Sequence, residues 1–246
     1  GNFREFLEIL NNYRKPVVEY LADSGILGPR TTLGHMAITG GHSCVDYPLG
    51  DELKLLAESG ATVGHCPHKC AKMAFAMESF DRYLAAGVRI GLGTDTYPLD
   101  IVSEMRYASL ISRLVDKNAC GARAAALFNA ATIGGATALG RSDLGRLAPG
   151  AKADVVILDL RTTRSGPTRD PINALVEYGS GADVETVIVD GEVVVEKGRS
   201  TRINDEELFA QAQAGANRAW DNWAARDWAT RTVEQINPPA FPTRRT

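Results

Sequence analysis

The stretch VRIGLGTD, residues 88–95, decides the fold, because it combines a short apolar strand with a glycine-flanked turn that ends in a carboxylate. Two earlier stretches have a similar form: TTLGHM at residues 31–36 and ATVGH at residues 61–65. Helices are predicted between and after these strands, over residues 51–59, 75–86 and 101–115. Strands that alternate with helices in this way are typical of βα units that build a parallel sheet. The sequence therefore predicts an α/β fold.

Each of the three predicted strands runs into a side chain that can do chemistry. His35 follows the first strand, His65 ends the second, and Asp95 follows the third. In βα barrels, the carboxyl ends of the strands and the loops after them hold the active site. We therefore expect these three side chains to face one site.

The second half of the chain differs from the first in composition and in its predicted elements. Residues 122–139 are rich in alanine and predict a helix that is interrupted by a pair of glycines. Residues 154–158 predict a strand, and residues 184–196 predict a β-hairpin around an Asp-Gly turn. These strands are expected to form a small separate β-layer.

A long helix is predicted from residue 205 to about residue 233, and its three tryptophans are expected to serve core or interface packing. The tail after it is rich in proline. The predicted domain boundaries are 1–140 for the βα part, 141–200 for the β-layer and 201–246 for the C-terminal helix and tail.

Composition excludes several classes of protein. The 246 residues carry a formal net charge of -3, with 44% hydrophobic and 23% charged residues, as in ordinary soluble domains. There is no apolar run of about 18 residues, which a membrane span needs, and no basic stripe for nucleic acid. Four cysteines are too few for a disulfide-framed scaffold, so we expect reduced thiols and a cytoplasmic location. The chain begins without methionine, so a segment upstream of it is a further hypothesis.

Asp95 and His35 are the first candidates for catalysis. A carboxylate directly after a buried strand can bind a metal or act as a base, although an aspartate there can also cap a helix or turn. A single histidine beside an apolar strand is more often a packed core residue. The coincidence of His35 and Asp95 at two strand ends favours the functional interpretation.

The segment HCPHKC, residues 65–70, offers two histidines and two cysteines within six positions. Structural zinc sites normally use ligand pairs separated by a long segment, so we do not expect an independent zinc site here. His65 is expected to line a pocket, and Cys66 and Cys70 to be packing thiols.

Three other polar residues are expected to have structural roles and no part in the chemistry. His42 is expected to be an exposed loop histidine. Glu104 and Arg106 are expected to form ion pairs on a helix face or to hold the barrel rim. The sequence contains no phosphate-binding loop, dinucleotide fingerprint or nucleophile elbow.

The chain resembles the C-terminal portion of the metal-dependent amidohydrolase superfamily, in the branch of cytosine deaminase-like, adenosine-analogue and triazine aminohydrolases and chlorohydrolases. The resemblance runs almost continuously from about residue 17 to residue 198. The matching segments are residues 25–28, 34–35, 51–61, 63–67, 91–95, 104–106, 131–136, 144–150, 153–154 and 187–191.

This resemblance implies a (β/α)8 TIM-type barrel, of which the chain contains strands six to eight, together with strands of a small β-sandwich. His35 matches the histidine that ends strand six and polarises the group under attack. Asp95 matches the strand-eight aspartate, a metal ligand that also takes a proton from the attacking water. His65 falls on the strand-seven motif that lines the substrate pocket, and His68 in the same motif is a second expected substrate contact.

Two departures from the family pattern stand out. The His-x-His of strand one, the histidine of strand five and the proton-shuttling glutamate after it have no counterpart among the four histidines of this chain. The resemblance therefore predicts a partial barrel that begins after strand five. The pair Lys69-Cys70 also stands where many relatives carry Ser-Asn, which leaves the substrate open.

The resemblance implies that the intact protein hydrolyses C–N bonds of a purine, pyrimidine, pterin or triazine, with one divalent metal ion that lowers the pKa of a bound water. Zinc is the expected metal, with iron and manganese as alternatives. Hydrolysis of a cyclic amide or a halogenated ring is an alternative within the superfamily. A non-catalytic module, truncated or completed by a partner, is a third hypothesis. The expected partners are a small heterocyclic substrate and either a second copy of the chain or a missing N-terminal segment, but neither nucleic acid nor membrane.

Overall fold

The structure, a computed structural model, describes residues 2–163 and 165–241. Its first half contains a parallel sheet in the order β1-β2-β3. The strands are β1 (Thr32–Gly34), β2 (Thr62–His65) and β3 (Arg89–Leu92). Gly64 of the central strand pairs with Gly34 on one side and Gly91 on the other. The predicted parallel α/β arrangement is therefore confirmed.

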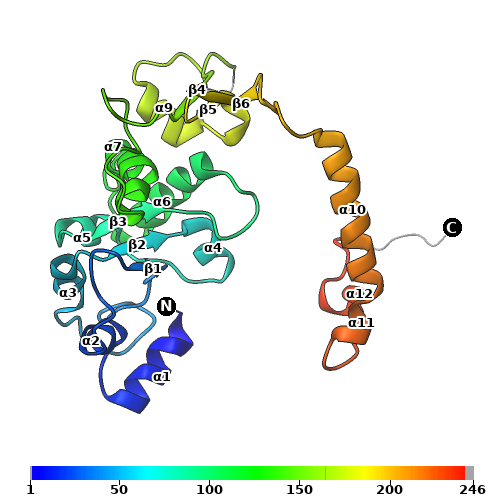
Figure 1. The fold of residues 1–246 in the computed structure, drawn as a ribbon. Coiled ribbons are helices and arrows are strands. Elements are labelled where there is room, and N and C mark those ends of the chain that lie inside the picture. The colour runs from blue at the N-terminus through cyan, green and yellow to red at the C-terminus, as the bar shows by residue number, and fades with distance from the viewer. Residues whose placement is uncertain (1, 164, 242–246) are drawn as a thin grey trace.

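Helices accompany the sheet in the expected alternation (Figure 1). Their bounds are α1 (Phe3–Tyr13), α2 (Val17–Asp23), α3 (Glu52–Ser59), α4 (Pro67–Lys72), α5 (Phe80–Ala85) and α6 (Ile101–Asp116). The prediction over 75–86 was wrong at its start, because the Ser79 side chain accepts the Arg82 N–H and caps α5 there. The hydrophobic core forms where α3, α5 and α6 bury Leu56, Phe80 and Met105 against the sheet. Burying a side chain of this size contributes about 2 kcal/mol, so this core fixes the strands that carry the site.

The alanine-rich segment is helical throughout, so the predicted interruption at the glycine pair was wrong. It forms α7 (Ala124–Asn129), the π-helical turn η1 (Ala130–Gly134) and α8 (Gly135–Ala138). Gly134 keeps helical dihedral angles, with φ -60° and ψ -44°. A Cβ at Gly134 would lie 2.2 Å from the carbonyl oxygen of Ile90, so glycine lets this turn approach β3 at backbone distance.

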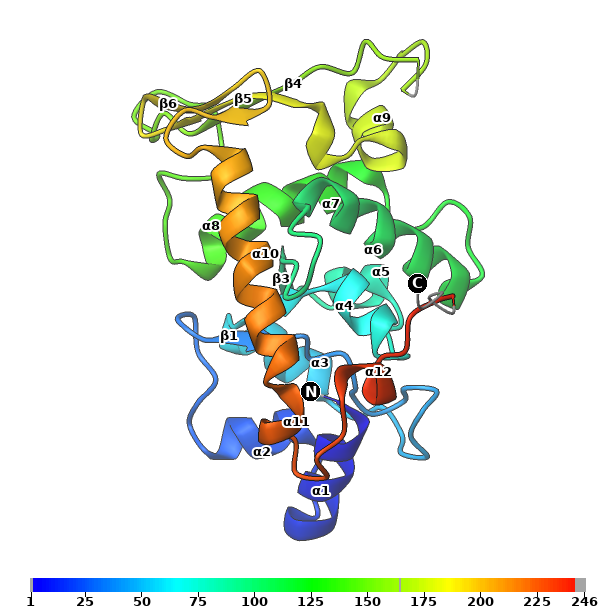
Figure 2. The ribbon, with the colours of Figure 1, turned by 90° about the vertical axis from the view of Figure 1, so that its right-hand side faces the viewer.

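A second sheet is antiparallel, in the order β4-β5-β6-β7. Its strands are β4 (Val155–Leu158), β5 (Val184–Val189), β6 (Glu192–Glu196) and β7 (Arg199–Ser200). Between β4 and β5 the chain forms α9 (Pro171–Tyr178) and η2 (Gly181–Asp183). The predicted hairpin is confirmed: Asp190 and Gly191 both have positive φ, 51° and 85°, as a type I′ turn requires. Figure 2 shows this sheet above the helices that cover β3.

The C-terminal arm, residues 205–236, leaves the second sheet and stands apart from the first (Figure 1). It consists of α10 (Asp205–Asp221), α11 (Trp223–Arg226) and α12 (Val233–Ile236), so the prediction of one continuous helix was wrong. The Asn222 side chain donates to the Arg218 carbonyl, and the Asp227 carboxylate accepts the N–H groups of Ala229 and Arg231. These local bonds replace helical ones and break the helix.

The arm does not provide the core packing that its tryptophans led us to expect. Trp220, Trp223 and Trp228 are 50%, 42% and 89% exposed. Of the proline-rich tail, residues 242–246 lie outside the described residues. Within the described part of the chain, no helix is long and apolar enough to cross a membrane.

Candidate active site

His35 and Asp95 lie together at the carboxyl ends of β1 and β3. His35 Nε2 is 3.2 Å from Asp95 Oδ2. Both residues have left-handed backbone conformations, with φ 65° at His35 and 46° at Asp95. Such conformations are unfavourable for residues other than glycine and concentrate at functional sites. The local backbone thus turns both side chains out of their strands and toward one another.

Lys69 completes this contact from the first turn of α4. Its ammonium group donates to Asp95 Oδ2, and Nζ lies 3.2 Å from His35 Nε2. The sheet places the three groups together, since β2, which leads into α4, lies between the strands that precede His35 and Asp95. One cation, one imidazole and one carboxylate therefore converge at a single point.

The charges of this group follow from its contacts. The hydrogen bond from Lys69, together with its charge, lowers the pKa of Asp95. Burial and the Lys69 charge lower the pKa of His35 more than Asp95 raises it. At neutral pH the site therefore presents an ionised carboxylate beside a neutral imidazole that can donate or accept a hydrogen bond.

Buried neighbours hold His35 in place. Cys70 Sγ lies 3.8 Å from His35 Nδ1, and the Tyr83 hydroxyl donates to the Met36 carbonyl at 2.8 Å. Burial raises the pKa of Cys66 to about 11 and that of Cys70 to about 12. Both thiols stay protonated at neutral pH, which fits packing rather than nucleophilic chemistry.

His65 and His68 do not join this contact. His65 is 2% exposed, its ring lies near Phe80, and burial lowers its pKa to about 3. His68 stacks on Tyr107 with ring centroids 4.7 Å apart. His65 is thus a neutral buried ring beneath the site, and His68 is held at its side.

His42, Glu104 and Arg106 make contacts that differ from those expected. His42 is 3% exposed and bonds to the Ala76 carbonyl at 2.9 Å, so the exposed-loop prediction was wrong. Glu104 is 1% exposed and accepts the His68 backbone N–H, and Arg106 donates to the Gly179 carbonyl. In the part of the chain that the structure describes, Glu104 and Arg106 thus bond to other segments and do not form helix-face ion pairs, and the alternative that they hold the barrel rim stays a prediction.

The residues described here do not fit a complete metal site. His35 and Asp95 carry donor atoms that zinc accepts, but a catalytic zinc takes about three protein ligands. The Lys69 ammonium occupies the contact between these two donors. Across residues 2–163 and 165–241, no group of three or more His, Cys, Asp or Glu side chains is arranged to hold a metal ion.

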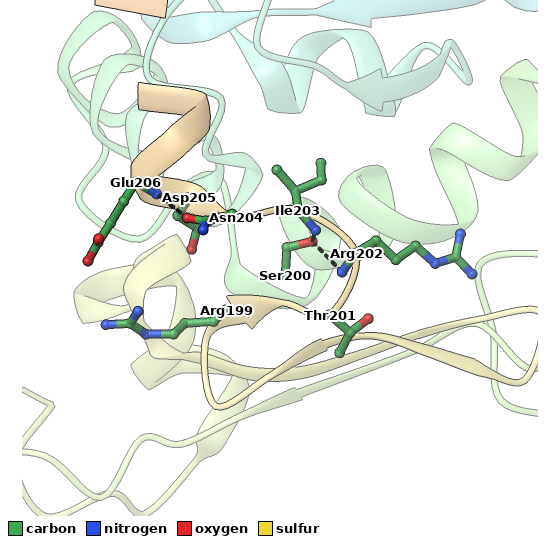
Figure 3. Close-up of a pocket in the computed structure, with 8 residues that line it drawn as sticks. All are labelled: Arg199, Ser200, Thr201, Arg202, Ile203, Asn204, Asp205 and Glu206. Carbon is green, nitrogen blue, oxygen red and sulfur yellow. Dashed lines mark hydrogen bonds between the residues drawn. The ribbon is translucent and has the colours of Figure 1, made fainter. Parts of the chain in front are cut away.

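A separate hollow of about 590 Å³ lies where β7 turns into the arm, lined by residues 199–206 (Figure 3). Its polar groups serve the local backbone: Ser200 Oγ accepts the N–H groups of Arg202 and Ile203, and Asn204 caps α10. None of the predicted site residues lines this hollow. The carboxyl ends of the parallel strands remain the candidate active site.

The sequence reasoning missed Lys69 and Glu104 as members of this region. Lys69 carried a signal, since it departs from the family pattern next to an expected pocket residue. Glu104 lies in a segment that matches the family, residues 104–106, but its burial was not expected, because a glutamate on an amphipathic helix is normally solvated.

Comparisons with known proteins identify the family of this chain. Residues 11–194 match a family model described as the amidohydrolase family. The chain is 34% identical over 218 residues to a 5-methylthioadenosine/S-adenosylhomocysteine deaminase of Pelotomaculum thermopropionicum, which covers 87% of this chain and 48% of the relative. It is 36% identical over 216 residues to a 5'-deoxyadenosine deaminase of Methanothermobacter thermautotrophicus, with coverage of 86% and 48%. The chain spans about half the length of the curated relatives it matches.

Two solved structures are similar over the same extent. An adenosine deaminase from Xanthomonas campestris with bound zinc has a TM-score of 0.79 at 26% identity, covering 88% of this chain and 48% of that one. The atrazine chlorohydrolase TrzN from Arthrobacter aurescens, complexed with zinc, has a TM-score of 0.73 at 26% identity, with coverage of 87% and 47%.

Proposed function

This chain belongs to the amidohydrolase family, and we propose that it forms part of a hydrolase that deaminates a nitrogen heterocycle. The observation that carries the proposal is the contact between His35 and Asp95 at the ends of two parallel strands, 3.2 Å apart. The deaminase names of its relatives support C–N bond hydrolysis and an adenosine-like ring as the first substrate to test.

We propose distinct roles for the two central residues. Asp95, ionised at neutral pH, accepts a proton from the attacking water. His35, neutral at pH 7, donates a hydrogen bond to the oxygen or ring atom on which charge develops. His65 and His68 are proposed substrate contacts, and because both rings are held by other side chains, they would shape the pocket wall.

We propose that Asp95 is also one ligand of a divalent metal ion. Its carboxylate and the zinc in two structural neighbours support this assignment. The remaining ligands would have to come from protein outside the described residues. Zinc is the first metal to test, with iron and manganese as alternatives.

We further propose that β1, β2 and β3 are strands six, seven and eight of a TIM-type barrel, and that β4–β7 belong to a β-sandwich. The domain boundaries at 1–140, 141–200 and 201–246 are proposed on the same basis. A missing N-terminal segment or a second polypeptide would then complete the barrel.

Displacement at a halogenated or otherwise substituted ring is a second candidate, supported by the similarity to a chlorohydrolase of known structure. Cyclic-amide hydrolysis is an alternative of the same kind. One panel of aminated, chlorinated and cyclic-amide substrates distinguishes these reactions.

The coding sequence upstream of Gly1 provides the first test. A His-x-His and a His-x-x-Glu in frame there support the proposal. The protein so defined, loaded with zinc, is then assayed for ammonia release from adenosine, 5'-methylthioadenosine and an aminotriazine. Absence of both motifs, with no turnover of any member of the panel, would instead support a non-catalytic module.

A further inference from the structure

Glu104 is a buried acid that the proposed chemistry does not use. It lies in the first turn of α6, and 1% of the residue is exposed. Burying a carboxylate is costly unless a partner compensates for it. The partner is the backbone N–H of His68, which donates to Glu104 Oε2 at 3.0 Å.

Helix α4 needs this contact because it lacks a cap of its own. Cys66 precedes the helix and makes no side-chain capping hydrogen bond, and Pro67 at its first position has no N–H. The His68 N–H is therefore the first helical donor without a partner inside α4. Glu104 supplies from a different helix the acceptor that Ser, Asn or Asp normally supplies locally.

The position of α4 decides where Lys69 reaches. The helix has only six residues, too few to be stable without tertiary contacts. Lys69 follows His68 directly, and its ammonium is the group that contacts Asp95 and His35. Glu104, in turn, stands on the helix that follows the Asp95 loop, so its bond ties the two loops of the site together.

We propose that Glu104 is a positioning residue, whose buried carboxylate caps α4 and thereby sets the place of Lys69 against His35 and Asp95. The proposal rests on the proposed function only for the roles of His35 and Asp95.

The environment of Glu104 makes its hydrogen bond with the His68 N–H sensitive to pH. Its charged and titratable neighbours are His68 on α4, Asp100 at the start of α6, and the thiols of Cys66 and Cys70. Burial raises the pKa of Glu104 to about 7, against the opposing effect of the His68 N–H. The His68 amide therefore bonds to an acceptor whose charge changes near neutral pH.

The test compares Glu104→Leu, which removes the acceptor, with Glu104→Gln, which keeps a carbonyl oxygen. Amide hydrogen exchange of His68 and the imidazole signals of His35 are followed by NMR in the 246-residue chain. In Glu104→Leu, exchange at His68 should accelerate at least about tenfold, the factor that 1.4 kcal/mol represents, and the His35 signals should shift. Glu104→Gln should restore both.

Two control variants isolate the positioning effect. Leu56→Ala weakens the core at α3, a helix that carries none of the site residues, and should leave the His35 signals in place. Glu58→Gln removes an exposed glutamate and should change neither readout. Unchanged His68 exchange in a folded Glu104→Leu variant overturns the proposal, as does an equal His35 shift in Leu56→Ala.

A pH titration of the wild-type chain tests the role of Glu104 even if Glu104→Leu does not fold. The His68 amide signal should shift with a midpoint near pH 7, and this shift should exceed any that remains in Glu104→Gln. A signal that titrates equally in both proteins overturns the proposal. Neither readout requires turnover, so failure here is distinct from failure of the proposed deaminase activity.

Discussion

The parallel sheet and its helices bury large apolar residues in a core, whereas the C-terminal arm leaves its own exposed. In the sheet and its helices, Val63, Tyr83 and Leu127 are fully buried. In the arm, α10 buries no residue, and Phe209 is 70% exposed. Figure 1 shows the arm standing clear of the sheet.

This difference shows that a helix can form from local interactions without being packed into a core. Asn204 caps α10 by accepting the N–H groups of Glu206 and Glu207, and acidic residues fill its first turn. These local interactions, with five alanines spread along the helix, make a helix without tertiary packing. The sheet instead fixes its strands by burial, and only there do side chains from distant parts of the sequence converge on a site.

The strongest test of this contrast is Asp95→Ala in the metal-loaded, complete protein. Loss of the proposed base and metal ligand should reduce kcat by at least about 10⁴-fold, measured as ammonia release. In the metal-free protein the free energy of unfolding should not change measurably, because the Asp95–Lys69 pair is partly exposed.

Asp159→Ala is the matched control, since this exposed aspartate pairs with Arg161 away from the parallel sheet. It should leave turnover unchanged. Retained activity in Asp95→Ala would remove this residue from the mechanism and place the site elsewhere.

The second test uses His65, a buried base in the sheet that has no analogue in the arm. Burial lowers its pKa to about 3 from 6.5. Between these values the unfolded chain binds a proton that the folded chain excludes, so stability is complete above pH 6.5 and falls as the pH drops toward 3. The loss should approach about 5 kcal/mol for this single group.

Urea unfolding of the wild type and of His65→Asn at pH 7 and pH 4 measures this effect. The difference in unfolding free energy between the two proteins should shift in favour of His65→Asn at the lower pH. The same difference at both pH values would show that His65 is protonated inside the fold, or solvated, which contradicts its burial.

The sequence predicted those parts of the molecule where local pattern and tertiary packing agree. Period and turn residues predicted the parallel strands, the hairpin and the α/β class, because burial against helices requires those same patterns. The sequence predicted that His35 and Asp95 face one site at the carboxyl ends of the strands, and the structure brings their side chains into contact.

Features that depend on packing alone escaped prediction. Nothing in the local sequence shows that Glu104 points inward to a backbone N–H of another helix, or that His42 is enclosed. The glycine pair at 134–135 suggested a break, whereas Gly134 permits close contact with β3. The tryptophans suggested packing that the described chain does not supply.

The third test examines that close contact with two neighbouring glycines. Gly134→Ala places a Cβ 2.2 Å from the Ile90 carbonyl oxygen and should cost about 3 kcal/mol of unfolding free energy. A Cβ at Gly135 meets nothing within 4 Å, so Gly135→Ala should stabilise by about 0.5 kcal/mol through helix propensity. Urea unfolding followed by far-UV circular dichroism measures both. Equal effects would mean that the π-helical turn does not press on the sheet.

The smallest effect is expected in the arm, and its three tryptophans, the only ones in the sequence, provide the probe. Trp228 is 89% exposed and contacts the Arg231 guanidinium, whose carbon lies 5.4 Å from the ring centroid. Trp228→Ala should therefore change the unfolding free energy of the sheet by less than about 0.5 kcal/mol. In the wild type, tryptophan emission should respond to urea gradually, while circular dichroism shows the cooperative transition of the sheet. Coincident transitions by both probes would mean that the arm and the sheet unfold as one unit. The two regions would then differ in the exposure of their apolar residues but not in stability.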